Sequence, residues 1–267
     1  KLMCSRIILF FLLCLLSHSS LSQVNIMGKP GYINTPTAGW FEDRPVGLTF
    51  AFMPGDYSQF KNELTDVYFY NLRGSFTSFF EVNFTIAHRP VRAKLNNLGI
   101  GDRHLDIRFR LLKETETRPG IVLGLTPPGS AAPYLSHDYL VLTKRISIGS
   151  GVMELTSGYG SPFVFIKRPN ANSIFDYSIE RKSTTNLKAD YLTGFFAGFS
   201  YSPIQFGGLM LEFDSNTING GVYLRPWQWL NLQAYTYEGK DWGLNAAFNM
   251  SLDFPPKSLR KYAKTMD

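Results

Sequence analysis

Histidine is the residue type in this sequence with the most evident potential for catalysis or metal binding. Beyond residue 22 the histidines are His88, His104 and His137, and none of them has the spacing of a metal-binding motif such as His-x-x-x-His. No Gly-x-Ser-x-Gly nucleophile elbow occurs either. His137 stands beside Asp138, but neighbouring residues of a strand face opposite sides of the sheet. The sequence therefore predicts no catalytic site, no metal site and no cofactor.

Charged residues on the polar side of alternating segments form a stronger pattern. They are Arg73, Glu81, Asp106, Arg108, Arg110, Glu154, Glu212 and Arg225. In a closed barrel they would point into the lumen, either as a network of ion pairs that ties the strands together or as a polar conduit for a saccharide or an ion. Small barrels are filled by their own side chains, whereas open channels usually need about sixteen strands. Because both signs of charge are present, we favour the network.

The segments that carry these charges alternate between apolar and polar residues with a period of two. Residues 242–254 place Leu, Ala, Phe and Met on one face and Asn, Ser and Asp on the other. Residues 103–111 repeat the pattern, with Leu, Ile and Phe opposite His, Asp and Arg. A helix would distribute these charges around its whole surface, so the alternation predicts strands.

About twelve such strands, within a range of ten to fourteen, are predicted in antiparallel, up-and-down order. They are 45–54, 66–74, 79–89, 102–113, 119–126, 136–146, 151–159, 192–202, 205–213, 218–225, 229–237 and 242–254. Several short connections alternate with long ones, as in membrane barrels with tight periplasmic turns and longer outer loops. An even number of strands returns both ends to one side, which would be the periplasm.

Strands of a soluble sandwich or lipocalin-like barrel also alternate between apolar and polar residues. The composition of the two strand faces distinguishes these folds from a membrane barrel. The apolar faces carry no charge, whereas the opposite faces mix Asn, Gln, Gly, Arg and Glu. A lipid-facing exterior around a wet interior accounts for both faces. Trp227 and Trp229 flank a short turn, and Trp242 begins the last strand, which predicts aromatic girdles at opposite rims. We therefore expect an all-β, antiparallel transmembrane barrel over residues 45–254.

The ends of the chain lie outside the predicted barrel. A basic start, an apolar stretch and small residues predict a signal peptide at 1–22. The apolar stretch 7–16 is too short for a membrane-spanning helix, and the leucines before Cys14 argue against a lipid anchor there. Residues 255–267 form a basic tail, predicted to be periplasmic. Without these ends the body of the chain is close to neutral, so no nucleic-acid partner is expected.

Two further segments have no assigned role in the wall of the barrel. Residues 23–44, rich in Gly, Pro and Thr, could form a plug in the lumen or a periplasmic lead-in, and the sequence leaves both open. The loop 160–191 is too long for a passive turn, and it is expected to pack over the barrel mouth or to meet a partner. The apolar residues of this loop that predict such a contact are Phe163, Phe165, Ile174 and Phe175.

The segment 28–38, GKPGYINTPTA, is the most recognisable stretch of the sequence, and 101–112, 119–125, 139–145 and 211–221 are further distinctive stretches. The first of them resembles the opening of the YjbH family of outer-membrane proteins, which are associated with exopolysaccharide gene clusters. The next two continue the resemblance, and the last two are similar to a later strand and a late hairpin of the family. Longer members look like two barrel-like halves, whereas this chain has room for one barrel. The resemblance implies a role in polysaccharide production or export.

These observations lead to an outer-membrane β-barrel without catalytic activity, in the envelope of a Gram-negative bacterium. Two roles from different classes remain open: a component for the production or export of an extracellular polysaccharide, and an accessory structural subunit of a larger outer-membrane protein-assembly or secretion complex. The expected partners are outer-membrane lipid, other envelope proteins and, for the first role, the polysaccharide itself.

Overall fold

A computed structural model of the chain describes residues 23–58, 65–90, 101–130, 133–168, 176–182 and 191–252. The predicted signal peptide at 1–22, the basic tail at 255–267, and Ile174 and Phe175 lie outside these ranges. Within the described ranges, no helix is both long enough and apolar enough to span a membrane.

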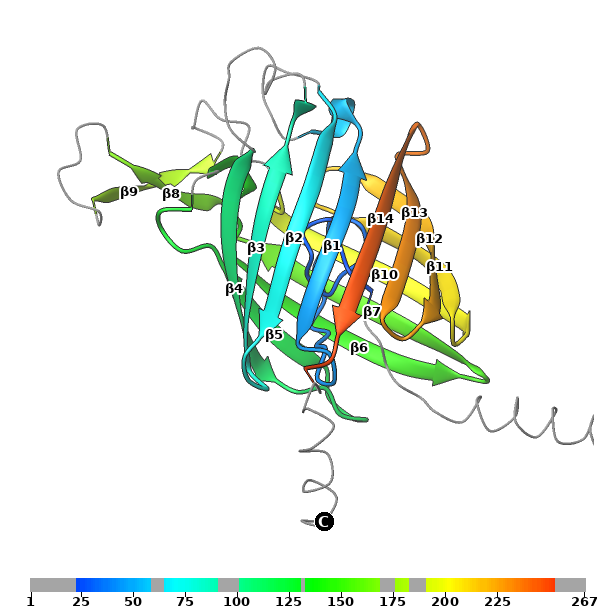
Figure 1. The fold of residues 1–267 in the computed structure, drawn as a ribbon. Coiled ribbons are helices and arrows are strands. Elements are labelled where there is room, and N and C mark those ends of the chain that lie inside the picture. Colours follow the sequence, from blue (N-terminus) through cyan, green and yellow to red (C-terminus); the bar gives the residue numbers. More distant parts are fainter. Residues whose placement is uncertain are drawn as a thin grey trace, which may run out of the picture.

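Twelve strands close into one barrel in which every strand is antiparallel to its neighbours (Figure 1). The strands are β1 (Val46–Met53), β2 (Val67–Ser75), β3 (Phe80–His88), β4 (Asp102–Leu112), β5 (Gly120–Leu125), β6 (Tyr139–Ile148), β7 (Gly151–Gly160), β10 (Gly194–Ile204), β11 (Gly207–Phe213), β12 (Ile218–Trp227), β13 (Leu230–Tyr237) and β14 (Asp241–Met250). Pairing of β1 with β14 closes the barrel, with Val46 opposite Met250. The predicted fold class and strand number are confirmed.

The period-two pattern of the sequence becomes the inside and the outside of the barrel. On β14, Leu244 is 60% exposed on the outer face, whereas the next residue, Asn245, is 4% exposed inside. On β4, Leu105 and Leu111 are exposed, and His104, Asp106 and Arg108 between and beside them are buried. The apolar side of each strand therefore faces outward, opposite to the arrangement in a soluble barrel.

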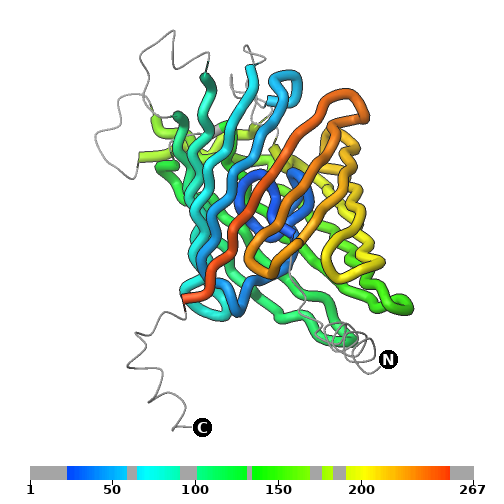
Figure 2. Tube along the Cα trace, turned by 45° about the vertical axis from the view of Figure 1, so that its right-hand side comes forward, coloured from blue at the N-terminus to red at the C-terminus, as the bar shows by residue number. Residues whose placement is uncertain are grey.

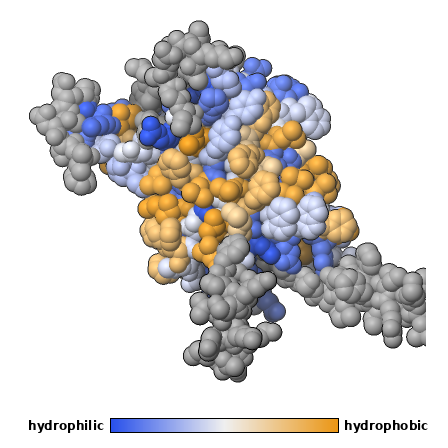
Figure 3. All heavy atoms as spheres, in the orientation of Figure 1, coloured by the Kyte–Doolittle hydropathy of each residue, from blue (hydrophilic) through white to orange (hydrophobic). Residues whose placement is uncertain are grey.

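The outer wall is mostly apolar over its middle. In the view of Figure 3, a hydrophobic band crosses the wall, and hydrophilic residues gather toward both rims. Trp227 and Trp229 are exposed and stacked, with ring centroids 5.3 Å apart. Trp242 is 70% exposed and is the second residue of β14, at the opposite end of the barrel. The predicted girdle residues thus lie on the outer surface, at both rims.

The connections divide the barrel into two unlike ends. One end, here called the short-turn rim, has the connections 76–79, 113–119, 149–150, 205–206 and 228–229, and there β1 begins and β14 ends. The other end, here called the long-loop rim, has the connections 54–66, 89–101, 126–138, 161–193, 214–217 and 238–240. The alternation of short and long connections follows the sequence expectation, including the last two connections of the long-loop rim, which the sequence also indicated to be short.

The long-loop rim carries secondary structure that the alternation did not predict. Two short 3₁₀ helices, η1 (Gly55–Tyr57) and η2 (Pro133–Leu135), lie there. Residues 136–138, predicted to begin a strand, lie before β6 instead. Within the loop 160–191, β8 (Phe163–Lys167) and β9 (Tyr177–Arg181) pair as a separate two-stranded sheet. This hairpin projects sideways from the barrel (Figure 1).

Residues 23–41 lie inside the barrel, and all of them are buried. Figure 2 shows this segment as a compact coil of chain, in blue, between the walls. The sequence left two positions open for this segment, a plug in the lumen and a periplasmic lead-in, and the structure places residues 23–41 in the lumen. We refer to residues 23–41 as the plug.

Candidate functional site

The plug is held in its conformation partly by polar contacts between its own residues. The side-chain oxygen of Asn25 accepts hydrogen bonds from the backbone N–H groups of Met27 and Lys29, at 3.1 and 3.0 Å. Gly28 between them has a φ of +77°, and a Cβ there would lie 2.5 Å from Cβ of Asn71 on the wall. Only glycine combines that backbone conformation with so close an approach.

Side-chain amides on the wall satisfy the backbone carbonyls of the first plug residues. The amide nitrogens donate from Asn245 to Val24 at 2.6 Å, from Asn71 to Ile26 at 2.8 Å and from Asn83 to Met27 at 2.6 Å. These three asparagines are on β14, β2 and β3. Because buried backbone groups need partners, the plug and this part of the wall are matched to each other.

The carboxylate of Glu212 on β11 binds the middle of the plug from the opposite wall. It accepts hydrogen bonds from the backbone N–H groups of Ile33 at 3.0 Å, Asn34 at 2.8 Å and Thr35 at 2.9 Å. The hydroxyl of Thr35 donates to the same carboxylate at 2.7 Å. Asp214 accepts from the side chain of Asn34 at 2.5 Å. Glu212 thus serves as an anion site for a turn of the chain rather than as half of an ion pair.

Two arginines share one buried glutamate nearer the short-turn rim. Glu81 accepts from Arg108 at 2.5 Å and from Arg73 at 3.2 Å, and all three side chains are buried. Arg108 also donates to the carbonyl oxygen of Thr37 in the plug, at 2.8 Å. Arg73 lies over the ring of Phe41, 4.1 Å from its centroid. The group therefore joins β2, β3 and β4 to the end of the plug.

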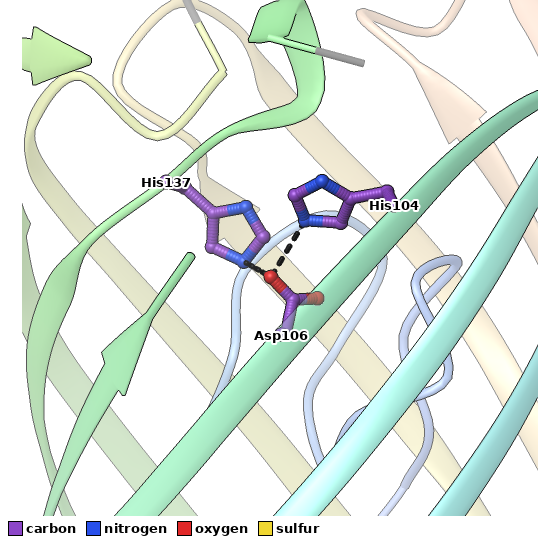
Figure 4. A group of neighbouring side chains, drawn as sticks. All are labelled: His104, Asp106 and His137. Atoms are coloured by element: carbon purple, nitrogen blue, oxygen red, sulfur yellow. Dashed lines mark hydrogen bonds and ion pairs between the residues drawn. The ribbon is translucent and has the colours of Figure 1, made fainter. Parts of the chain in front are cut away.

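The most unusual group surrounds Asp106 on β4, toward the long-loop rim (Figure 4). Its carboxylate lies 2.6 Å from Nε2 of His104 and 3.5 Å from Nε2 of His137. Nζ of Lys29, from the plug, donates to the same carboxylate at 2.9 Å and is hydrogen-bonded to His137. All four side chains are buried. Two imidazoles and a carboxylate are also a donor set that can hold a divalent metal ion.

The remaining charges that were predicted to face the lumen lie toward the short-turn rim. Glu154 pairs with Arg145 at 2.7 Å, and the guanidinium of Arg225 lies 5.1 Å from the ring centroid of Tyr223. Arg110 donates to Glu42 at 2.7 Å, just beyond the plug. That hydrogen bond, with a second one from Lys113, holds the pKa of the exposed Glu42 carboxyl below its usual value.

The predicted charges thus face the lumen. Their contacts gather around Glu81, Asp106, Glu154 and Glu212, with Arg110 on Glu42 and Arg225 over Tyr223, and most of the four groups also bind the plug. A position of 23–44 in the lumen was one of two possibilities, but the hydrogen bonds that join this segment to the charged residues of the wall were not predicted.

The predicted partner loop is represented by the β8–β9 hairpin. Phe163 and Phe165 are 50% and 37% exposed, and Ile179, which faces Phe165 across the hairpin, is 66% exposed. Ile174 and Phe175, predicted to share this role, lie outside the described residues. The hairpin therefore presents an apolar surface beside the barrel mouth.

The grouping of Lys29, His104 and His137 around Asp106 was not predicted from the sequence. The alternation had placed His104 on the same face of its strand as Asp106, two residues away, which is the signal that could have joined these two side chains. Lys29 and His137 come from segments without a strand pattern, and no periodicity in the sequence brings them to β4.

Comparison with known protein families identifies the family of the whole chain. Residues 23–266 match the YjbH family model, described as exopolysaccharide biosynthesis protein YbjH. The matched range includes the plug and all strands of the barrel. No curated protein matches the chain.

Proposed function

Because the chain belongs to the YjbH family of exopolysaccharide biosynthesis proteins, we propose that it is a non-catalytic outer-membrane β-barrel that supports the production or export of an extracellular polysaccharide. The apolar outer wall, the exposed tryptophans at both rims and the even number of strands support the membrane location and periplasmic ends.

The observation that carries the proposal is the plug. Its backbone is hydrogen-bonded to β2, β3 and β14 on one side and to Glu212 of β11 on the other. Hydrogen bonds to both sides of the wall indicate that the plug stays in the lumen as a permanent part of the fold. It then leaves no open path through which a saccharide could pass. The barrel then acts in polysaccharide production as a closed scaffold, and not as an open saccharide pore.

Two measurements test this role. Deletion of the gene should lower the amount of surface polysaccharide, and expression of the wild-type chain should restore it. The purified protein in a planar lipid bilayer should show no stable conductance. Unchanged polysaccharide after deletion would overturn the biosynthetic role, whereas a steady open pore would overturn the closed scaffold and leave that role intact.

A second candidate, an accessory subunit of a larger outer-membrane assembly or secretion complex, is favoured by the β8–β9 hairpin. Its exposed apolar side chains project beyond the wall, where a neighbouring envelope protein could cover them. Under this alternative, a defined set of proteins co-purifies with the wild type after mild detergent extraction. The same set should be lost with Phe163→Ser/Ile179→Ser but retained with the matched outer-wall variant Leu244→Ser.

A further inference from the structure

The side chains of His104, Asp106 and His137 lie close together, although the plug contacts only Asp106 and His137 of these three through Lys29. His104 and Asp106 are two residues apart on β4, so they lie side by side on its inner face. His137 approaches them from the connection that precedes β6. The candidate ligand atoms of the three residues all lie within 4.8 Å of one another, and every one of the residues is buried (Figure 4).

Both imidazole rings are held through Nδ1, which directs Nε2 toward one carboxylate oxygen. Nδ1 of His137 lies 2.7 Å from the carbonyl oxygen of Leu135, and a carbonyl can only accept, so this nitrogen carries a proton. Nδ1 of His104 is hydrogen-bonded to Oγ of Ser130 at 2.9 Å. Its Nε2 donates to the Asp106 carboxylate at 2.6 Å, so this ring must release that proton, or move it to Nδ1 with Ser130 as the acceptor, before Nε2 can bind a metal ion. Outer contacts of this kind orient the histidines of metal sites and fix their tautomers.

The plug already places a cation in this site. The ammonium of Lys29 donates to Asp106 and is hydrogen-bonded to Nε2 of His137. An ammonium has no lone pair, so Nε2 of His137 must accept, and the ring is neutral. Neutral imidazole and ionised carboxylate are the forms in which these side chains bind a metal ion.

We propose that His104, Asp106 and His137 form a site for a first-row divalent metal ion of the Zn²⁺ type, for which Lys29 and the metal ion compete. Two histidines and a carboxylate are a known three-residue zinc set, with the fourth position left to water. Bonds of about 2.1 Å in tetrahedral geometry separate two ligand atoms by about 3.4 Å. The separation of 3.5 Å between Asp106 and His137 fits, and the 2.6 Å between His104 and Asp106 has to widen.

The competition links metal binding to the plug. A metal ion that takes the place of the Lys29 ammonium releases one contact between the plug and β4, and by reciprocity any loosening of the plug raises metal affinity. The site does not depend on the proposed role in polysaccharide production, since it rests on the local geometry alone.

Co²⁺ is the probe for the test, because a four-coordinate Co²⁺ site absorbs visible light. The protein is the full barrel in detergent, as wild type and as Lys29→Met, which removes the ammonium but keeps an unbranched apolar chain. Loss of the ammonium leaves Asp106 buried without its cation, so a metal ion is bound more favourably. We expect one Co²⁺ per barrel and a Kd at least about tenfold lower in Lys29→Met, with Zn²⁺ displacing the probe.

Two double variants in the Lys29→Met background provide the matched comparison. Added His137→Ala should abolish the absorption bands, whereas added His88→Ala, at a histidine on β3 outside the group, should retain them. Equal Co²⁺ affinity of Lys29→Met and wild type, or affinity unchanged by His137→Ala, would overturn the proposal. If Lys29→Met does not fold, the wild type decides: it must bind Co²⁺ at millimolar concentration, and His137→Ala must not.

Discussion

Glu212 illustrates how much depends on one side chain in this barrel. Its carboxylate accepts hydrogen bonds from three consecutive backbone N–H groups of the plug, and it is buried at 2% exposure. Glu212→Ala would leave these donors without a partner, at a cost of about 1–3 kcal/mol for each. We expect the free energy of unfolding, measured in urea with lipid vesicles, to fall by at least about 3 kcal/mol.

The control for this variant is Glu116→Ala, at an exposed acidic residue in the connection between β4 and β5. It should change the free energy of unfolding by less than about 0.5 kcal/mol. Glu212→Ala should also produce intermittent conductance in planar bilayers, because the plug loses its contact with β11. A Glu212→Ala protein as stable and as silent as the wild type would show that the contact does not retain the plug.

The pair formed by Glu42 and Arg110 sets a small pH dependence of stability. The pKa of Glu42 is lowered in the folded state, first through the hydrogen bond from Arg110. Its contribution is therefore present above the unfolded value near 4.5, and it is lost as the pH falls through the folded pKa. Exposed pairs of this kind contribute about 0–1 kcal/mol.

Thermal unfolding at pH 7 and pH 3 measures this contribution. Glu42→Gln should lower Tm slightly at pH 7, and the difference from the wild type should be smaller at pH 3, because it disappears as the pH falls through the folded pKa of Glu42. Asp43→Asn, at the neighbouring exposed acid, is the matched control, and its effect on Tm at pH 7 should be smaller than that of Glu42→Gln. A larger effect of Glu42→Gln at pH 3 than at pH 7 would contradict the assignment.

At the scale of elements, the fit between strand and plug depends on small residues in the wall. Gly198 on β10 lies against Tyr32 of the plug, and a Cβ at this position would be 2.1 Å from a ring carbon. Gly198→Ala therefore forces the Tyr32 ring to move, with an expected loss of about 1–3 kcal/mol in the free energy of unfolding.

Gly220 on β12 offers the matched strand glycine. The nearest atom to a Cβ there is 3.5 Å away, an ordinary contact, so Gly220→Ala should be close to neutral. The free energy of unfolding in urea should be measured for both variants. The rate at which a protease of broad specificity cleaves within the plug then reports how far each variant exposes it. Equal stability and equal cleavage in the two variants would show that Tyr32 adjusts without cost.

At the scale of the whole molecule, the outward apolar surface predicts how the protein behaves in solution. Phe195, Leu209, Leu224 and Leu244 are all more than half exposed, on different strands. A soluble protein rarely exposes so extended an apolar wall. We expect the barrel to require detergent or lipid to remain dispersed, and to migrate differently on SDS gels before and after boiling. A monodisperse preparation in plain buffer would rule out the membrane location.

Much of the fold could be predicted from the sequence, because a strand separates its two faces within a few residues. The alternation in residues 103–111 and 242–254 distinguishes outside from inside without knowledge of any neighbour. The strand number followed from repetition of that pattern, and the resemblance to YjbH was confirmed by the family match over residues 23–266. The hairpin β8–β9 was missed because each of its strands has only five residues.

The sequence by itself therefore determined the twelve strands of the barrel wall, the order in which they follow one another and the face that each turns outward, since all three depend on residues close together in the chain. Only the tertiary structure decided what fills the lumen. Lys29 meets Asp106 across 77 residues and His137 across 108, and Thr35 meets Glu212 across 177. Such contacts exist only once the barrel has closed around the plug, because closure alone brings those side chains within hydrogen-bonding distance.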